Sequence, residues 1–440
     1  MKVVVAPDSF KGSISATLAA KALARGVRKA APGAKAIEAP MADGGEGTVE
    51  AMVAATGGRF VEARVEDPLG RHITARYGFL PDGRTAVIEM AAASGLTLIS
   101  REERNPMRTT TFGTGELILD AAARGARNVI VGIGGSATVD GGTGMARALG
   151  IRFFDAEGRE VTGGGGVLRA IRRIDASGLD RRVKSIAFTV ASDVTNPLVG
   201  PEGAAAVYGP QKGATAQMVA ELDAGLRNLA ARMRMDLGVE VEDTAGAVTI
   251  GAGTIGAGAA GAGAAGGLGA ALMAFLGARM RSGVEIVIEA VDLAGKMRGA
   301  DLVITGEGRV DAQSAYGKAV SGVAAAASKA KAPCVIVAGS ILAGTIGAGT
   351  IGAGAEAMLG RGVTAMFSIA EGPATEEELM ANAETLLERA GERVMRIFLA
   401  GRATAKESKA SGRAFGQATK KKQTRAPVKR VGATKKARRR

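Results

Sequence analysis

Carboxylates and glycines stand at the ends of short β-branched runs in this sequence. Five runs share the pattern, and in chain order they are VVVAPDSFKGS ending at Asp8, VIVGIGGSATVDGG at Asp140, AFTVASDVTNPL at Asp193, ADLVITGEGRVD at Glu307 and CVIVAGS at Gly339. In open parallel sheets, ligands bind beyond the carboxyl ends of the strands, where loop amides and helix N-termini also point. We therefore expect these acids to gather around a ligand.

These residue types suit phosphoryl transfer. That reaction needs carboxylates to hold magnesium, amides and cations to bind phosphate oxygens, and one group that orients or deprotonates the attacking hydroxyl. The segment PMADGGEGT places Asp43 and Glu46 beside two glycines, and APDSFKG sets Asp8, Ser9 and Lys11 on one tight turn. Each motif alone is more often a helix cap or an ordinary turn, but the series of them favours a phosphate site.

A glycine-rich stretch supplies the backbone amides that such a site needs. The sequence GIGGSATVDGGTG, which contains Gly134, Gly135 and Ser136, follows a strand and precedes a helical pattern. Consecutive loop amides of this kind can cradle phosphates. The loop is not a Walker A motif, because it lacks the G-K-[ST] ending.

Composition excludes several other chemistries. The chain has one Cys and one His in 440 residues, which excludes a disulfide framework and a Cys/His zinc site. His72 lies in a polar turn, where we expect it to face solvent rather than act as a base. The scarcity of Cys and the absence of a long uninterrupted apolar run favour a soluble, cytoplasmic protein with no membrane partner.

The C-terminal segment is strongly basic. Residues 403–440 carry eight Lys and six Arg against Glu407 alone, which is +13 of the net charge of +14. With so little apolar surface to bury, we expect residues 403–440 to be a disordered tail. It is either a solubilising extension or a segment that binds nucleic acid or other polyanions without sequence specificity.

The body of the chain has the organisation of an α/β protein. Ala-rich stretches of helical length, such as residues 15–31, 116–123 and 317–330, alternate with the β-branched runs. A chain of this length is too long for one ordinary domain, so we expect two α/β domains.

Nine segments in series resemble the successive signature blocks of the bacterial glycerate kinase family, first class. They are VVVAPDSFKGSISA, PMADGGEGTVEA, VEDPLGR, AVIEMAAASGLTLI, RTTTFGTGELI, GIGGSATVDGGTGMA, ASDVTNPLVGPEGAA, YGPQKGA and ITGEGRVDAQSAYGK. The resemblance covers roughly residues 1–400. Three positions depart from the family pattern: Val139 stands where Asn is expected, Ser192 where Cys is usual, and Ala319 where Pro often follows GK.

The resemblance implies ATP-dependent phosphorylation of D-glycerate to a phosphoglycerate, with magnesium. It also implies a Rossmann-like or flavodoxin-like domain of residues 1–63 with 293–402, and a second α/β domain of residues 64–292 inserted into it. The sequence leaves open whether the 2-hydroxyl or the 3-hydroxyl is phosphorylated, and it leaves the oligomeric state open.

Site roles follow from the motifs together with the resemblance. We expect Asp193 to orient or deprotonate the glycerate hydroxyl, with Lys11 and Asp8 as further catalytic residues. The nucleotide and its phosphates are assigned to Gly134, Gly135, Ser136, Asp140 and Lys212. The substrate is assigned to Ser9, Arg71, Arg108 and Asn196, and magnesium to Asp43, Glu46 and Glu307. For Arg71, Arg108 and Lys212, a solvated position at the protein surface is nearly as good an interpretation.

The sequence TIGAGTIGAGA occurs twice, at residues 249–259 and 345–355, and each copy contains a G-x-G-x-x-G pattern. The first copy has no acid from residue 244 to 283 to hold ribose hydroxyls, and nine residues separate Val337 from Gly347 in the second. A dinucleotide fingerprint needs its first glycine at the strand end. We therefore interpret the copies as loop duplications. The alternatives are a nicotinamide-dependent hydroxy-acid oxidoreductase and a nucleic-acid-associated protein acting through the tail.

Overall fold

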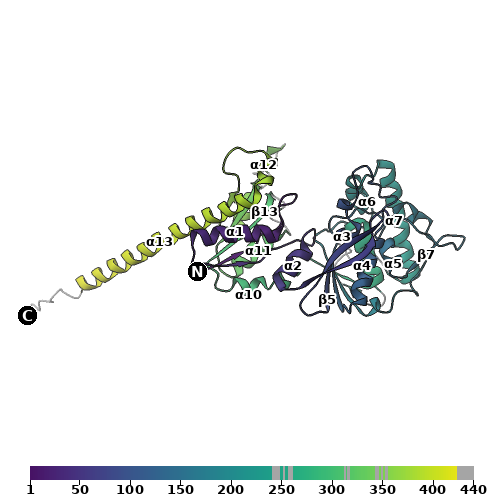
Figure 1. The fold of residues 1–440 in the computed structure, drawn as a ribbon, viewed down its shortest axis with the longest axis horizontal. Coiled ribbons are helices and arrows are strands. Elements are labelled where there is room, and N and C mark those ends of the chain that lie inside the picture. The colour runs from purple at the N-terminus through teal and green to yellow at the C-terminus, as the bar shows by residue number, and fades with distance from the viewer. Residues whose placement is uncertain are drawn as a thin grey trace, which may run out of the picture.

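The fold is built on two separate β-sheets with helices on their faces (Figure 1), which confirms the expected α/β class. The computed structural model describes residues 1–239, 248–250, 253–255, 261–311, 314, 318–341, 346–347, 350–351 and 355–423. The two large sheets have five and six strands.

The first sheet is parallel throughout, in the order β17-β14-β13-β1-β2. Its strands are β1 (Lys2–Val5), β2 (Lys35–Glu38), β13 (Leu302–Val310), β14 (Cys334–Ile341) and β17 (Ala365–Ser368). Val3, Val4 and Val5 of β1 are fully buried, as expected for a central strand covered on both faces.

Helices cover both faces of this sheet. Val3 and Val5 face a core formed with α1 (Ala16–Ala30) and α13 (Ala383–Gln423), which run side by side in Figure 1. Val4 faces the opposite core, formed with α2 (Thr48–Thr56), α9 (Gly283–Ala290), α10 (Leu293–Met297) and α11 (Ala319–Lys329). Alternate β1 side chains therefore serve two layers of helices.

The second sheet is mixed, in the order β12-β9-β6-β5-β4-β3. Its strands are β3 (Arg59–Glu66), β4 (His72–Phe79), β5 (Thr85–Glu89), β6 (Asn128–Gly132), β9 (Ala187–Ala191) and β12 (Arg279–Arg281). The β3–β4 and β4–β5 pairs are antiparallel, whereas β5, β6, β9 and β12 are parallel. The carboxyl ends of these four strands therefore lie at one edge of the sheet.

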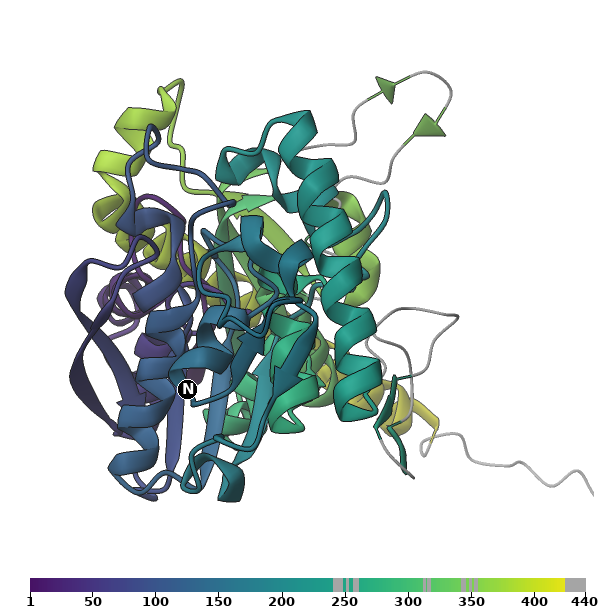
Figure 2. The same ribbon diagram turned by 90° about the vertical axis from the view of Figure 1, so that its right-hand side faces the viewer.

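Several helices and short elements complete this half, which faces the viewer in Figure 2. The helices are α3 (Ala91–Ser94), α4 (Phe112–Ala123), α5 (Thr143–Ala148), α6 (Ala204–Tyr208), α7 (Ala216–Leu237) and α8 (Leu268–Leu276), with the short pair β7 (Arg152–Phe154) and β8 (Arg173–Asp175). Among the described residues, the 3-10 helices are η1 (Leu96–Leu98), η2 (Gly165–Ala170), η3 (Val183–Ser185), η4 (Pro210–Lys212), η5 (Ala264–Gly267) and η7 (Ala355–Arg361), and α12 (Glu376–Ala381) precedes α13.

In sequence, the strands of the second sheet lie between β2 and β13 of the first sheet. The expected boundary at residues 63 and 64 falls inside β3, and the boundary at residues 292 and 293 falls at the start of α10. A boundary inside a strand would divide one hydrogen-bonded ladder between two domains. The division into residues 1–63 with 293–402 and residues 64–292 stays a prediction.

The helix α13 continues to Gln423, although we expect disorder over residues 403–440, and the disorder stays a prediction. Residues 403–423 are rich in Ala and Lys, which are strong helix formers. Figure 1 shows the helix extending away from the body of the molecule. Residues 424–440 lie outside the described residues.

Parts of both TIGAGTIGAGA copies form small antiparallel ladders. In the first copy, β10 (Val248–Ile250) pairs with β11 (Gly253–Ile255), and in the second, β15 (Ile346–Gly347) pairs with β16 (Thr350–Ile351). Each pair is a two-stranded sheet of its own; β15 and β16 stand apart from the large sheets in Figure 2. The remaining residues of both copies lie outside the described residues.

Within the described part of the chain, no helix combines the length and the apolar character that crossing a membrane requires.

Candidate active site

A central cavity of about 570 Å³ lies between the two sheets, where loops from both of them meet. Most of the expected site residues line it, namely Lys11, Asp43, Glu46, Gly134, Gly135, Ser136, Asp193 and Lys212, together with Gly44, Gly45, Ser192, Tyr208, Gln211 and Lys318. The structure thus brings together residues that are up to 307 positions apart in the chain. Of the four acids expected at strand ends, Asp193 lies here with the glycine-rich loop.

Glycines let two of the loops touch backbone to backbone. A Cβ atom on Gly132 would lie 2.6 Å from the carbonyl oxygen of Gly44, and a Cβ atom on Gly134 would lie 2.8 Å from the Cα atom of Gly45. Gly44 itself has a φ of 89°, and a Cβ atom there would meet the carbonyl oxygen of Ala191 at 2.7 Å. Side chains at these positions would separate the loop after β2 from the loop after β6.

A buried lysine stands behind the glycine-rich loop. Lys212 is 1% exposed, and its Nζ donates to Ser136 Oγ at 2.6 Å and to the Thr138 carbonyl oxygen at 2.7 Å. Burial lowers the pKa of Lys212 to about 7, although the charge of Asp140 opposes this shift. An anion bound in the central cavity would stabilise the charged ammonium and raise its pKa again.

Asp193 follows β9 and faces the start of α9. Its carboxylate accepts hydrogen bonds from the Ser282 side chain and from the backbone amides of Gly283 and Val284. Although much of the residue is exposed, desolvation of the carboxylate and the nearby charge of Asp43 raise its pKa, against the effect of those hydrogen bonds. The first turn of α9 therefore fixes the orientation of a carboxylate that points into the central cavity.

A second cavity, which we call the acidic cavity, has a volume of about 600 Å³ and lies at the carboxyl ends of β1, β13 and β14. Asp8, Ser9, Asp43 and Glu307 line it with Lys11, Arg309 and Lys318, and Phe10, Ile369, Leu379 and Met380 supply an apolar wall. It shares Lys11, Asp43 and Lys318 with the central cavity. The two cavities therefore meet at these three side chains.

Burial and neighbouring acids raise the pKa of Asp8 in this cavity. Asp8 is 7% exposed, and burial first, then the charges of Asp43 and Glu307, raise its pKa to about 7, while the Ser9 amide and Lys11 act in the opposite direction. Burial also raises the pKa of Glu307. The Oε1 atom of Glu307 is buried and has no hydrogen-bond partner among the described residues.

These carboxylates can be compared with what magnesium needs. No group of three or more His, Cys, Asp or Glu side chains in the described part of the chain is placed to hold a metal ion by protein ligands alone. Magnesium, however, is usually held by one or two carboxylates together with substrate phosphates and water. The mutual repulsion at Asp8 and the unpartnered oxygen of Glu307 are conditions that a divalent cation would relieve, so the donor set fits such a cation.

Asp140 is one of the residues expected to contact phosphate. It is fully buried, and its Oδ2 accepts from the Thr111 amide at 2.8 Å, the Thr111 hydroxyl at 2.7 Å and the Gly144 amide at 3.1 Å, while its Oδ1 accepts from the Gly142 amide at 3.0 Å. It is not among the residues that line the central cavity. Both oxygens of Asp140 bind the loops that begin α4 and α5, and its expected phosphate contact stays a prediction.

Three expected substrate residues also lie elsewhere. Arg71 pairs with Asp67 at 2.5 Å and Glu103 at 2.8 Å in the turn between β3 and β4, and Arg108 is exposed. Asn196 donates to the Glu202 carbonyl oxygen at 2.8 Å and accepts from the Tyr208 hydroxyl at 2.6 Å. None of Arg71, Arg108 and Asn196 belongs to the lining of the central or the acidic cavity.

Two of the departures from the family pattern can now be placed. The Val139 side chain is fully buried in the core of the second sheet. Where the family pattern has the amide of Asn, this chain therefore has an apolar side chain that packs in the core and does not line the central cavity. Ser192 lines the central cavity, and its Oγ accepts a hydrogen bond from the Val194 amide at 3.2 Å.

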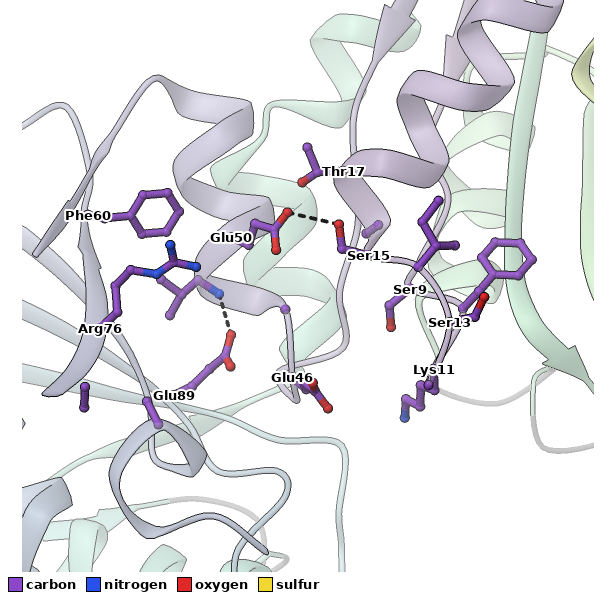
Figure 3. Close-up of a pocket in the computed structure, with 18 of the residues that line it drawn as sticks. Ser9, Lys11, Ser13, Ser15, Thr17, Glu46, Glu50, Phe60, Arg76 and Glu89 are labelled. Atoms are coloured by element: carbon purple, nitrogen blue, oxygen red, sulfur yellow. Dashed lines mark hydrogen bonds between the residues drawn. The ribbon is translucent and has the colours of Figure 1, made fainter. Parts of the chain in front are cut away.

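A third cavity of about 540 Å³, drawn in Figure 3, opens beside the central one and shares Lys11 and Glu46 with it. Its other polar lining residues include Ser15, Glu50, Arg76 and Glu89. Sequence reasoning did not identify Glu89 or Lys318 as site residues. Lys318 lies inside the quoted block ITGEGRVDAQSAYGK and could have been considered. Glu89 ends a strand, AVIE, in another quoted block, but its partners depend on the fold.

Comparisons with known proteins agree with this geometry. The sequence model of the Glycerate kinase family matches residues 3–399. The chain is similar to the glycerate kinase of Bacillus subtilis, with 47% identity covering 88% of this chain and 95% of the relative, and to the glycerate 2-kinase of Escherichia coli, with 47% identity covering 78% and 86%. It is also similar to the crystal structure of a putative glycerate kinase 2 from Salmonella typhimurium LT2, with a TM-score of 0.78, 45% identity, and coverage of 92% and 99%.

Proposed function

Since the chain belongs to the glycerate kinase family, we propose that it transfers the terminal phosphoryl group of ATP to D-glycerate where the central and acidic cavities meet. The observation that carries the proposal is that Lys11, Asp43 and Lys318 line both cavities. Phosphoryl transfer depends on positioning and electrostatic stabilisation, which these groups can supply. The oxidoreductase and nucleic-acid alternatives find no support in the relatives of this chain.

The acidic cavity is the better candidate for the nucleotide. It lies beyond the carboxyl ends of a parallel sheet, where nucleotides bind in open α/β folds. Its apolar wall of Phe10, Ile369, Leu379 and Met380 suits a purine base. Lys11 and Lys318 lie where a polyphosphate would pass towards the central cavity. Asp8, Asp43 and Glu307 would hold magnesium, which neutralises phosphate charge when it is bound.

The central cavity is the better candidate for glycerate. Asp193 can orient or deprotonate the attacking hydroxyl, since the start of α9 holds its carboxylate in place and raised basicity suits a base near neutral pH. Lys212 and Ser136 offer donors for the substrate carboxylate or for the transferred phosphoryl group. Lys11 lies between the two substrates and would stabilise the charge that spreads over the transferred group.

We further propose that the 2-hydroxyl accepts the phosphoryl group. The support is the name of the Escherichia coli relative, glycerate 2-kinase, which is 47% identical to this chain. Phosphorus NMR of the product distinguishes 2-phosphoglycerate from 3-phosphoglycerate directly. We place the reaction in the cytoplasm, in keeping with the single cysteine, Cys334, which is buried and free.

The proposed activity is tested by coupling ADP release to NADH oxidation. Purified protein with ATP and magnesium should release ADP when D-glycerate is added and should release none above background without it. L-Lactate and glucose serve as acceptor controls, because each carries a hydroxyl group but differs from glycerate in the rest of its structure. Equal rates with L-lactate or glucose and none with D-glycerate would contradict the proposal.

A further inference from the structure

The helix α2 begins without a capping side chain of its own. Its N-cap residue is Gly47, which has a φ of 91° and offers no side-chain acceptor. The first amides of a helix have no acceptor within the helix, and leaving them unpaired in a partly buried place is costly. The Thr48 amide lies 3.3 Å from the carbonyl oxygen of Gly45 in the preceding loop, and the other first amides need an acceptor from another part of the chain.

That acceptor is Glu89, the last residue of β5 in the second sheet. Its Oε1 accepts a hydrogen bond from the Val49 amide at 2.7 Å, drawn as a dashed line in Figure 3. Its carboxylate also receives hydrogen bonds from the amides of Gly47 and Thr48. A carboxylate at a helix N-terminus also interacts favourably with the positive end of the helix dipole. Glu89 thus caps a helix from a strand that lies 40 positions away.

The loop that this cap secures carries two of the acids of the site. Residues 43–47 run directly into α2, and Asp43 and Glu46 from this loop line the central cavity. On its other side the loop is held by the close backbone contacts of Gly44 with Gly132 and of Gly45 with Gly134. Glu89 and the glycine contacts therefore hold the loop from two directions, and both come from the second sheet.

We propose that Glu89 is a positioning residue for phosphoryl transfer: by capping α2 from β5, it holds the Asp43–Glu46 loop against the Gly134–Ser136 loop. Its role in turnover rests on the proposed function. Glu89 acts through the amides of Gly47, Thr48 and Val49 and not on the reacting atoms. The same contact joins the two sheets at the point where the substrates would meet.

The first test compares Glu89→Ala and Glu89→Gln with the control Glu62→Ala. Glu62 lies on β3, next but one to β5 in the same sheet, and is exposed. Removing a group that supports a ligand residue commonly costs about tenfold to a hundredfold in metal affinity or activity. We expect Glu89→Ala to lower kcat about tenfold or more and to raise the magnesium concentration needed for half-maximal rate. The KM for D-glycerate should change less than kcat.

The Glu89→Gln variant separates positioning from general stability. Its amide oxygen can still accept from α2, so it should recover part of the kcat lost in Glu89→Ala, while Glu62→Ala should match the unmodified protein. If Glu89→Ala lowered the melting temperature but left kcat and the magnesium requirement unchanged, Glu89 would be structural only and the inference would be overturned.

The second test needs no activity. Hydrogen exchange measured by mass spectrometry should show faster exchange over residues 43–53 in Glu89→Ala, with residues 216–237 of α7 unchanged. Equal exchange over residues 43–53 in both proteins would refute the cap. If the unmodified protein failed to phosphorylate glycerate, the proposed function would fail, while hydrogen exchange would still decide whether Glu89 holds this loop.

Discussion

At the scale of single residues, Lys212 is the group whose charge depends most directly on what occupies the site. Its pKa of about 7 reflects burial without a paired carboxylate. Because the folded-state pKa lies below the unfolded value of 10.5, the unfolded chain binds more protons between these two pH values. The contribution of Lys212 to the free energy of unfolding therefore rises with pH from about 7 to 10.5.

Anion binding should show the opposite dependence. The charged form of Lys212 binds an anion better, so affinity for D-glycerate should fall as pH rises above about 7, and binding there should take up a proton. Isothermal titration calorimetry in buffers of different ionisation enthalpy measures both quantities. A variant Lys212→Met should lose this pH dependence, whereas the exposed control Lys184→Met should keep it. An affinity that stays constant from pH 6 to 9 would contradict this assignment.

Asp193 gives a second prediction at this scale. The substitution Asp193→Asn keeps the shape and removes the charge, so kcat should fall by about a hundredfold or more, as expected for loss of a general base. Circular dichroism and melting temperature should stay close to those of the unmodified protein. The matched control is Asp180→Asn, since Asp180 pairs with Arg182 at the surface. Near-normal turnover of Asp193→Asn would move the role of base to Asp8.

The residues that could be predicted from the sequence share a simple origin. Asp8 and Asp193 stand directly after strands, and strand ends of a parallel sheet converge whatever the details of the loops. Asp140 also follows a strand, but its carboxylate turns back to the amides of its own and a neighbouring loop. Whether an acid faces a ligand or its own loop depends on the loop path, which no short motif encodes.

At the scale of elements, the parallel strands and the helices between them could be predicted from β-branched runs and Ala-rich stretches of the sequence. The pairing of β3, β4 and β5 was not predicted, because register in an antiparallel pair depends on contacts between residues far apart in sequence. The same limit explains Glu89. Its position at the end of β5 is visible in the sequence, but its contact with α2 arises only when both sheets are assembled.

The two TIGAGTIGAGA copies show how weakly glycine-rich strands fix their pairing. In the first copy Thr249 pairs with Thr254, whereas in the second Ile346 pairs with Ile351. Identical sequences therefore pair in registers that differ by two residues, since the partner of Thr254 is Thr249 whereas the partner of its counterpart Thr350 is Gly347, the counterpart of Gly251. Gly-rich strands specify register poorly, and neither ladder belongs to a large sheet.

Deletion of either ladder should be tolerated. We expect removal of residues 249–255 or 345–351 to leave the melting temperature and the rate of glycerate-dependent ADP release nearly unchanged, because ordering glycine-rich loops costs entropy and buries little apolar area. The closure entropy of the shortened loop changes by less than about 1 kcal/mol. A loss of more than about tenfold in kcat or in apparent ATP affinity, equivalent to about 1.4 kcal/mol, would return these segments to the site.

At the scale of the whole molecule, α13 has two parts with different physical roles. Its first turns are structural, since Leu387, Ala390, Val394 and Met395 are buried against α1 and the first sheet. Arg25 of α1 pairs with Glu384 at 2.7 Å and with Glu388 at 2.9 Å. Towards its C-terminal end the helix extends away from the body of the molecule (Figure 1).

Two truncations test this division. Ending the chain after Arg402 removes residues 403–440 but keeps the buried side chains and the contact of Arg402 with Asp301, so glycerate kinase activity and melting temperature should stay the same. Ending it after Asn382 removes Leu387, Val394 and Met395, each contributing about 1.5–3 kcal/mol by burial, and should abolish folding.

The truncation after Arg402 also removes a charge of +13. Any salt-sensitive binding of polyphosphate by the full chain should therefore disappear with residues 403–440. If the protein ending at Arg402 lost activity, the extended part of α13 would have to contribute to the site or to its stability.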